Sequence, residues 1–102
     1  MIVNLAMFPT SKGTDSASAD VAKVIDIIDK SGLPYKFGPM STAIEGEWDA
    51  VMAVVNKARK MLRRKHNRVY IVMTIDDRKG ARNRLTGKVR SVETRLGREV
   101  SK

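Results

Sequence analysis

Hydrophobic residues recur along the chain with two different periods, and each period predicts one kind of element. A two-residue period, rich in β-branched and aromatic side chains, predicts strands at residues 2–8, 35–37, 40–45 and 69–75. A helical period predicts helices at residues 18–31, 48–65 and 88–96. The order is that of the ferredoxin-like βαββαβ fold, in the α+β class. It predicts a four-stranded antiparallel sheet with two helices on one face, and a short C-terminal helix follows.

Two details of this pattern lead to specific expectations. Val69–Ile75 is so rich in β-branched residues that we expect a buried central strand. His66, the only histidine, follows a basic run at the end of the second helix, where we expect a solvated side chain.

The sheet face without helices would be bare in a single subunit, and we expect subunit association to cover it.

The length of 102 residues predicts one domain over residues 1–102, with residues 97–102 as a frayed tail. The absence of cysteine excludes disulfides, thiolate metal sites and a cysteine nucleophile. The apolar runs are much shorter than the roughly 20 residues of a membrane span, and the first residues lack a basic leader pattern. We therefore expect a cytoplasmic protein with no membrane association.

The net charge of +9 is unevenly distributed along the chain. Residues 1–56 sum to −3 and residues 57–102 to +12. A basic field of this size attracts nucleic acid or other anionic partners, but it also serves solubility alone. RNA-recognition domains of this topology carry two aromatic-rich strands, whereas here the first strand offers only Phe8 and the last only Tyr70. Nucleic-acid binding therefore remains an alternative rather than the first hypothesis.

Catalytic motifs are missing from the sequence. It contains no phosphate-binding glycine loop and no H-E-x-x-H motif, and a single histidine provides neither a Ser–His pair nor a histidine pair for a metal. We therefore expect a protein that is not an enzyme and has no metal site.

The most distinctive segment is residues 38–49. Strand alternation places Met40, Thr42 and Ile44 on one sheet face and Ser41 and Glu45 on the other. A hydroxyl and a carboxylate beside apolar side chains are typical of a small-molecule site. The plainer alternative is that Thr42 is an ordinary strand residue and Glu45 a solvated strand end. Trp48 likewise has two interpretations, as a ring that stacks on a cationic ligand or as a core anchor.

The chain as a whole resembles the small thiamine-binding protein family, the YkoF-like proteins of about one hundred residues. The resemblance spans nearly all of residues 2–96, and its most specific part is the Met-x-Thr-x-Ile-Glu-Gly-Glu stretch at residues 40–47. It is also carried by Gly13, residues 16–18, 21–22, 31–35, 38–39, 48–49, 75–78, 88–89 and 91–93. One departure is Asp20, which stands where the family often has tyrosine before its Val-Ala pair.

The resemblance implies a ferredoxin-like fold, a homodimer or homotetramer, and binding of thiamine or its hydroxymethylpyrimidine part near a subunit interface. It implies no reaction and no covalently bound cofactor. On this basis the candidate ligand-binding residues are Ser16, Ser18, Met40, Thr42, Ile44, Glu45 and Trp48, with Arg78 as a candidate phosphate contact. Two alternatives stay open: a nucleic-acid-binding module, and an oligomer that senses another metabolite.

Overall fold

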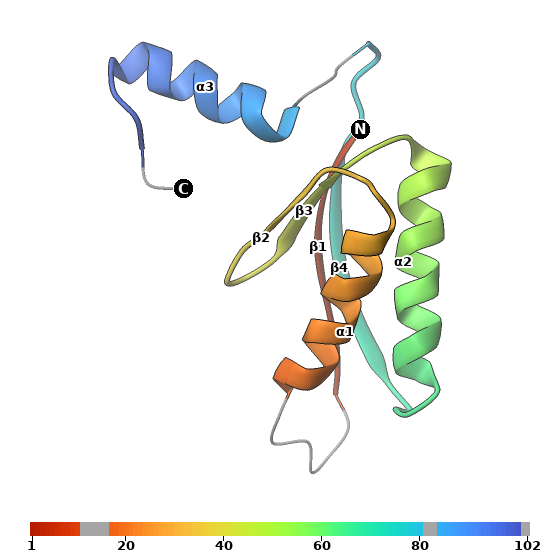
Figure 1. Cartoon of the computed structure of the whole chain (residues 1–102). Coiled ribbons are helices and arrows are strands. Elements are labelled where there is room, and N and C mark those ends of the chain that lie inside the picture. Colours follow the sequence, from red (N-terminus) through yellow and green to blue (C-terminus); the bar gives the residue numbers. More distant parts are fainter. Residues whose placement is uncertain (11–16, 81–83, 101–102) are drawn as a thin grey trace.

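The computed structural model describes residues 1–10, 17–80 and 84–100, and its elements follow the predicted order (Figure 1). The strands are β1 (Ile2–Pro9), β2 (Tyr35–Phe37), β3 (Thr42–Glu45) and β4 (Val69–Asp76). The helices are α1 (Ala17–Lys30), α2 (Trp48–Arg63) and α3 (Arg84–Leu96). Helix α1 begins at Ala17, one residue before the predicted start, so Ser18 lies in its first turn.

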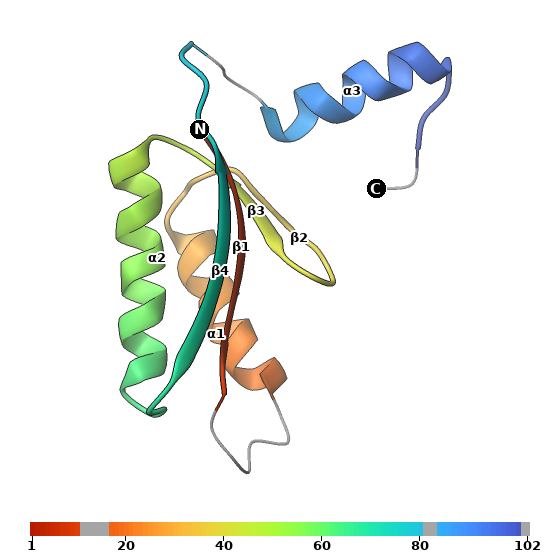
Figure 2. The ribbon, with the colours of Figure 1, turned by 180° about the vertical axis from the view of Figure 1, so that it is seen from behind.

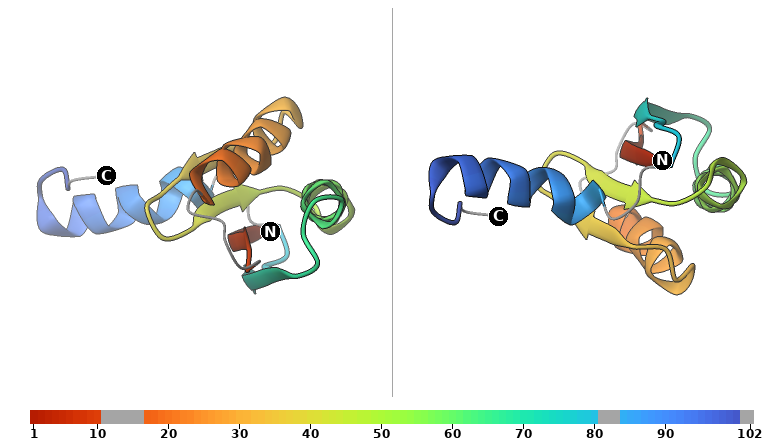
Figure 3. Two further views of the ribbon diagram at one scale, coloured as in Figure 1. Left: turned by 90° about the horizontal axis from the view of Figure 1, so that it is seen from below. Right: turned by 90° about the horizontal axis from the view of Figure 1, so that it is seen from above.

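The four strands form one antiparallel sheet in the order β2-β3-β1-β4. Helices α1 and α2 run in opposite directions and cover one face of this sheet, while the other face is left open (Figures 1 and 2). The predicted ferredoxin-like α+β fold is confirmed. Helix α3 lies outside the layer formed by α1 and α2; it contacts β3 and projects past the β2–β3 side (Figure 3).

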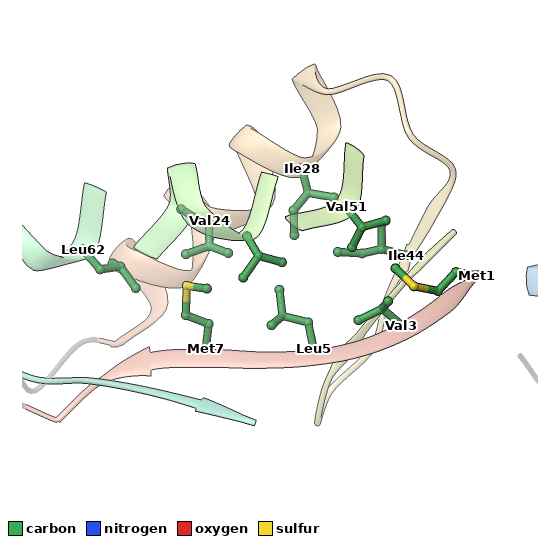
Figure 4. Close-up of a cluster of buried hydrophobic side chains, with 11 residues drawn as sticks. Met1, Val3, Leu5, Met7, Val24, Ile28, Ile44, Val51 and Leu62 are labelled. Carbon is green, nitrogen blue, oxygen red and sulfur yellow. The ribbon is translucent and has the colours of Figure 1, made fainter. Parts of the chain in front are cut away.

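The hydrophobic core lies between the sheet and the two helices (Figure 4). Alternate residues of β1 point into it, namely Val3, Leu5 and Met7, and β3 adds Ile44. The helices contribute residues at helical spacing, which are Val24, Ile28, Val51, Val55, Ala58 and Leu62. The hydrophobic periods of the sequence therefore converge on one core.

The expectation of a buried central strand at Val69–Ile75 is wrong, because β4 is an edge strand that pairs only with β1 among the described strands. The run is apolar on both faces, but only one face is covered. Ile71 and Met73 are half-buried under the helices, whereas Tyr70 and Val72 are 47% and 46% exposed. The composition of this segment predicted a hydrophobic strand correctly, but it could not predict the position of that strand in the sheet.

The expectation that His66 is a solvated residue is also wrong, since its side chain is buried. After α2 ends at Arg63, the His66 N–H donates to the Leu62 carbonyl, and Nη1 of Arg63 donates to the carbonyls of His66 and Asn67. This turn carries the imidazole back toward the start of α1. There His66 Nε2 lies 3.2 Å from Oδ2 of Asp20, which is buried as well.

Smaller differences concern the ends of elements. Helix α3 begins at Arg84, four residues before the predicted start, and β3 begins at Thr42 instead of residue 40. Gly97 adopts φ 72° and caps α3, since its N–H and that of Arg98 both donate to the Glu93 carbonyl. None of the helices in the described part of the chain has the length and apolarity that a bilayer crossing requires.

Candidate ligand-binding site

A pocket of about 290 Å³ lies between α1, β1 and the β2–β3 hairpin. Its walls come from three segments that are far apart in sequence. Helix α1 contributes Val21, Val24, Ile25 and Ile28, β1 contributes residues 5–8, and the hairpin contributes residues 37–42. The pocket is therefore a mostly apolar slot on the helix-covered side of the sheet.

The hairpin that closes this pocket depends on a close backbone approach at Gly38. The Gly38 N–H donates to the Ser41 carbonyl at 2.9 Å, and a Cβ on Gly38 would lie only 2.9 Å from the same oxygen. Any larger residue would therefore force the turn to open. The turn projects Met40 outward, where it is 87% exposed at the mouth of the pocket.

The polar side chains among the described lining residues are Ser41 and Thr42. The Ser41 hydroxyl donates to Oδ1 of Asn4 at 2.7 Å. Thr42 is in register with Leu5 and is buried, so its hydroxyl belongs to the helix-covered side. Its hydroxyl can donate and accept, so it offers a hydrogen bond to a ligand in this apolar slot.

The structure brings only some of the predicted site residues together. Met40 and Thr42 line the pocket, while Ile44 is fully buried in the core farther along β3. Glu45 pairs with Ile2 and lies on the open face of the sheet, so it does not meet the Thr42 hydroxyl. Glu45 is nevertheless buried and engaged in an interaction within the chain.

The remaining predicted residues lie away from the pocket. Trp48 begins α2 and is half-exposed, so it is not a core anchor. Arg78 is exposed and follows β4, whose last residue pairs with Ile2 at the end of β1 away from Phe8. Ser18 is exposed at the start of α1, and Ser16 lies outside the described residues.

A second hollow, of about 260 Å³, lies on the open face of the sheet. Asn4, Thr74 and Asp76 supply its polar side chains, and Ile2 and Ala43 line its floor. It is more polar than the slot beneath α1 and lies next to the strand end that carries Glu45. Sequence reasoning missed both the α1 wall of the first pocket and this hollow, because each depends on which strands are neighbours.

The described lining of the slot contains no titratable side chain, so the slot can hold a flat apolar ring but offers no acid or base. Across residues 1–10, 17–80 and 84–100, no three His, Asp or Glu side chains gather into a group that could hold a metal ion. The slot can therefore bind a ligand through its shape, through apolar contacts and through a hydroxyl group.

Comparison with known proteins places the chain in a family. Its sequence matches the family described as thiamine-binding protein over residues 3–93. A UPF0045 protein of Mycobacterium bovis is 34% identical over 97 residues, which cover 94% of each chain. A UPF0045 protein of Bacillus subtilis is 32% identical over 100 residues, which cover 93% of this chain and 96% of the relative.

Solved structures show the same fold. A hypothetical protein of Methanocaldococcus jannaschii superposes with a TM-score of 0.80 at 26% identity, over 89% of this chain and 93% of the other. A putative thiamine biosynthesis/salvage protein of Thermotoga maritima superposes with a TM-score of 0.77 at 23% identity, over 89% and 96% of the two chains. On the match of residues 3–93 and the relatives above 30% identity, this chain belongs to the thiamine-binding protein family.

Proposed function

We propose that this protein binds thiamine, or its hydroxymethylpyrimidine part, without catalysing a reaction, in the slot between α1 and the β2–β3 hairpin. The observation that carries the proposal is the hydroxyl of Thr42, a buried residue that lines a mostly apolar slot. Membership of the thiamine-binding protein family supports the ligand class.

The size of the slot favours one ring of the ligand over the whole molecule. Its volume of about 290 Å³ stands at the lower end of ligand pockets, which span roughly 300–1,000 Å³. An aminopyrimidine presents both donors and acceptors, and Thr42 can answer with either role of its hydroxyl. The charged thiazolium ring would then remain at the mouth near Met40, where its charge stays solvated.

The mouth of the slot suggests how a second subunit would contribute. Phe37 and Met40 at the rim are 61% and 87% exposed, and Phe8 beside them is 39% exposed. Apolar side chains this exposed favour a covered state. A second copy of the chain over the rim would close the slot and enclose the outer part of the ligand. Ligand roles for Ser16, Ser18, Glu45, Trp48 and Arg78 stay predictions.

Isothermal calorimetry with hydroxymethylpyrimidine, thiamine and thiamine pyrophosphate tests the proposal. We expect binding by the parent protein and a weakening of about tenfold in Thr42→Val, since one hydrogen bond contributes about 1 kcal/mol or somewhat more. Thr74→Val makes the same change in the open-face hollow and is the matched control.

Three outcomes would count against this proposal. No heat with any of the three ligands would remove thiamine binding altogether. A loss of affinity in Thr74→Val with none in Thr42→Val would move the site to the open face. Sedimentation that finds only 11.4 kDa material, with and without ligand, would remove the role of a second subunit.

A further inference from the structure

The outer surface of the two helices carries a basic ridge, defined here as Lys23 of α1 with Lys57, Lys60, Arg64 and Lys65 of α2 and its end. All five side chains are exposed. Positions 57, 60 and 64 recur at helical spacing, so they follow one side of α2. The buried residues Val51, Val55, Ala58 and Leu62 occupy the opposite side, so the ridge faces away from the sheet and from the ligand slot.

The fold adds the positive charge of Lys23 on α1 to that of the basic run on α2. Lys23 is more than thirty positions before the basic run, yet α1 and α2 are antiparallel and bring its ammonium group beside that of Lys65. The neighbouring Lys65 lowers the pKa of Lys23, and Asp20 offsets this only in part. Two ammonium groups held so close together raise the local positive potential, which an anion between them would relieve.

Among the described residues, the acidic side chains of α1 make their contacts with groups other than the ridge cations, apart from the effect of Asp20 on Lys23. No Asp or Glu occurs between Asp49 and Asp76. On α1, Asp20 is buried against His66, Asp26 pairs with Lys30 at 2.9 Å, and Asp29 accepts a hydrogen bond from the Tyr35 hydroxyl. Within residues 1–10, 17–80 and 84–100 no ion pair involves a ridge residue, so the charge of the ridge is available to a partner.

Two neighbouring arginines are excluded from the ridge because they serve the fold. Arg59 donates to Oδ1 of Asn56, and Arg63 donates to two backbone carbonyls at the end of α2. The five ridge residues are thus a defined set and not simply every cation in the region.

The surface around the ridge distinguishes among anionic partners. Among the described residues of α1 and α2, the only large exposed apolar side chain is Trp48, at the far end of α2. A membrane-bound helix needs an apolar face to insert, and a protein interface needs buried aromatic or aliphatic anchors. The ridge offers neither. Positive charge without apolar contact is instead the pattern that suits a phosphate backbone.

We propose that the basic ridge binds the phosphate backbone of double-stranded nucleic acid, without reading its sequence. This surface is separate from the slot beneath α1, so the proposal does not rest on thiamine binding. Residues 57–65 span about 12 Å at 1.5 Å per residue, along which a duplex presents about seven charges. Five cations facing them give a slope of log affinity against log salt of about −4.5.

Fluorescence anisotropy with a 20-base-pair duplex at salt concentrations from 50 to 200 mM tests this proposal. We expect binding by the full chain that weakens more than about 100-fold over this range. The triple variant Lys57→Ala, Lys60→Ala, Arg64→Ala should bind at least tenfold more weakly at 50 mM salt, with a slope smaller by about 3. Each single variant should reduce the slope by about 1, which keeps the test valid if the triple variant does not fold.

The control has the same net charge but a different location. Arg90→Ala, Arg95→Ala, Arg98→Ala removes three exposed arginines from α3 and its end, and we expect less than a threefold loss. Equal weakening by the two triple variants would mean that net charge alone attracts DNA, and would overturn the proposal. So would an absence of binding at 50 mM salt, or tighter ridge-dependent binding to phosphatidylserine vesicles than to the duplex.

Discussion

The two faces of the sheet are built from the same strands, but their side chains differ in solvent exposure. On the helix-covered face, β1 places Val3, Leu5 and Met7 at exposures of 7% or less. On the open face, Phe8 of β1 and Tyr70 of β4 stand with ring centroids 5.6 Å apart and remain 39% and 47% exposed. Alternation along a strand thus yields two apolar faces, of which the chain itself covers one.

This difference separates what holds the subunit together from what prepares it for association. The covered face contains the core, while the open face carries apolar side chains whose burial requires a second layer. Helix α3 does not provide that layer over β1 and β4, because it contacts β3 and projects past the β2–β3 side of the body (Figure 3). The open face and the apolar rim at Phe37 and Met40 are therefore the surfaces from which an oligomer would gain most.

The largest expected effect comes from making the same deletion on each face. Val3→Ala removes two methyl groups from a fully buried site and should lower the free energy of unfolding by about 2–3 kcal/mol. Val72→Ala makes the identical change at a side chain that is 46% exposed, and should cost well under about 1 kcal/mol in the isolated subunit. Urea unfolding at low protein concentration measures both.

A concentration series extends this comparison. If the open face is covered in an oligomer, the cost of Val72→Ala should grow as protein concentration rises, whereas that of Val3→Ala should not. Equal costs at low concentration would show that the two faces are covered alike within one subunit, and the contrast drawn here would fail.

The Asp20–His66 contact joins two buried polar side chains where α1 and the end of α2 pack. Removing either partner leaves the other buried without its neighbour, so Asp20→Ala and His66→Ala should each lower the free energy of unfolding by about 1–3 kcal/mol. A double-mutant cycle should give a coupling of at least about 0.5 kcal/mol. Additive losses would show that the two side chains are buried independently and do not stabilise each other.

The sequence predicted the order and type of every element, because hydrophobic periods are local properties that survive folding. It misplaced β4 because strand order is not local: an apolar run reads alike in the centre and at the edge of a sheet. It misjudged His66 for a similar reason, since the partner that buries it, Asp20, lies 46 positions earlier and meets it only when α1 and α2 pack.

The candidate site was predicted only along one strand. Alternation put Thr42 and Ile44 on one face and Glu45 on the other, and the register agrees, whereas Met40 lies in the turn before β3. The wall formed by Val21 and Ile25 had no separate signal, because residues that line a pocket and residues that fill a core share the same helical spacing. The basic ridge was visible as a charge run, but the contribution of Lys23 required the antiparallel helix pair.

The smallest effect concerns the rim of the covered face, where β2 is joined to α1. The Tyr35 hydroxyl donates to Oδ1 of Asp29 at 2.8 Å, and this hydrogen bond is the main reason why the pKa of Tyr35 is raised above its ordinary value of 10.0. A pKa that is raised by folding contributes stability below the unfolded value. That contribution is lost as the pH rises through the folded value. The parent should therefore lose stability above about pH 10 more steeply than Asp29→Ala does.

Ultraviolet titration of tyrosinate in a Tyr70→Phe background isolates Tyr35, since the chain has only two tyrosines. In that background Asp29→Ala should bring the pKa of Tyr35 down toward its ordinary value, because the acceptor and its negative charge are both gone. Asp26→Ala is the matched control: it removes a carboxylate from the same helix that pairs with Lys30 instead. If both variants left the titration of Tyr35 unchanged, the link between β2 and α1 at the edge of the covered face would not form in solution.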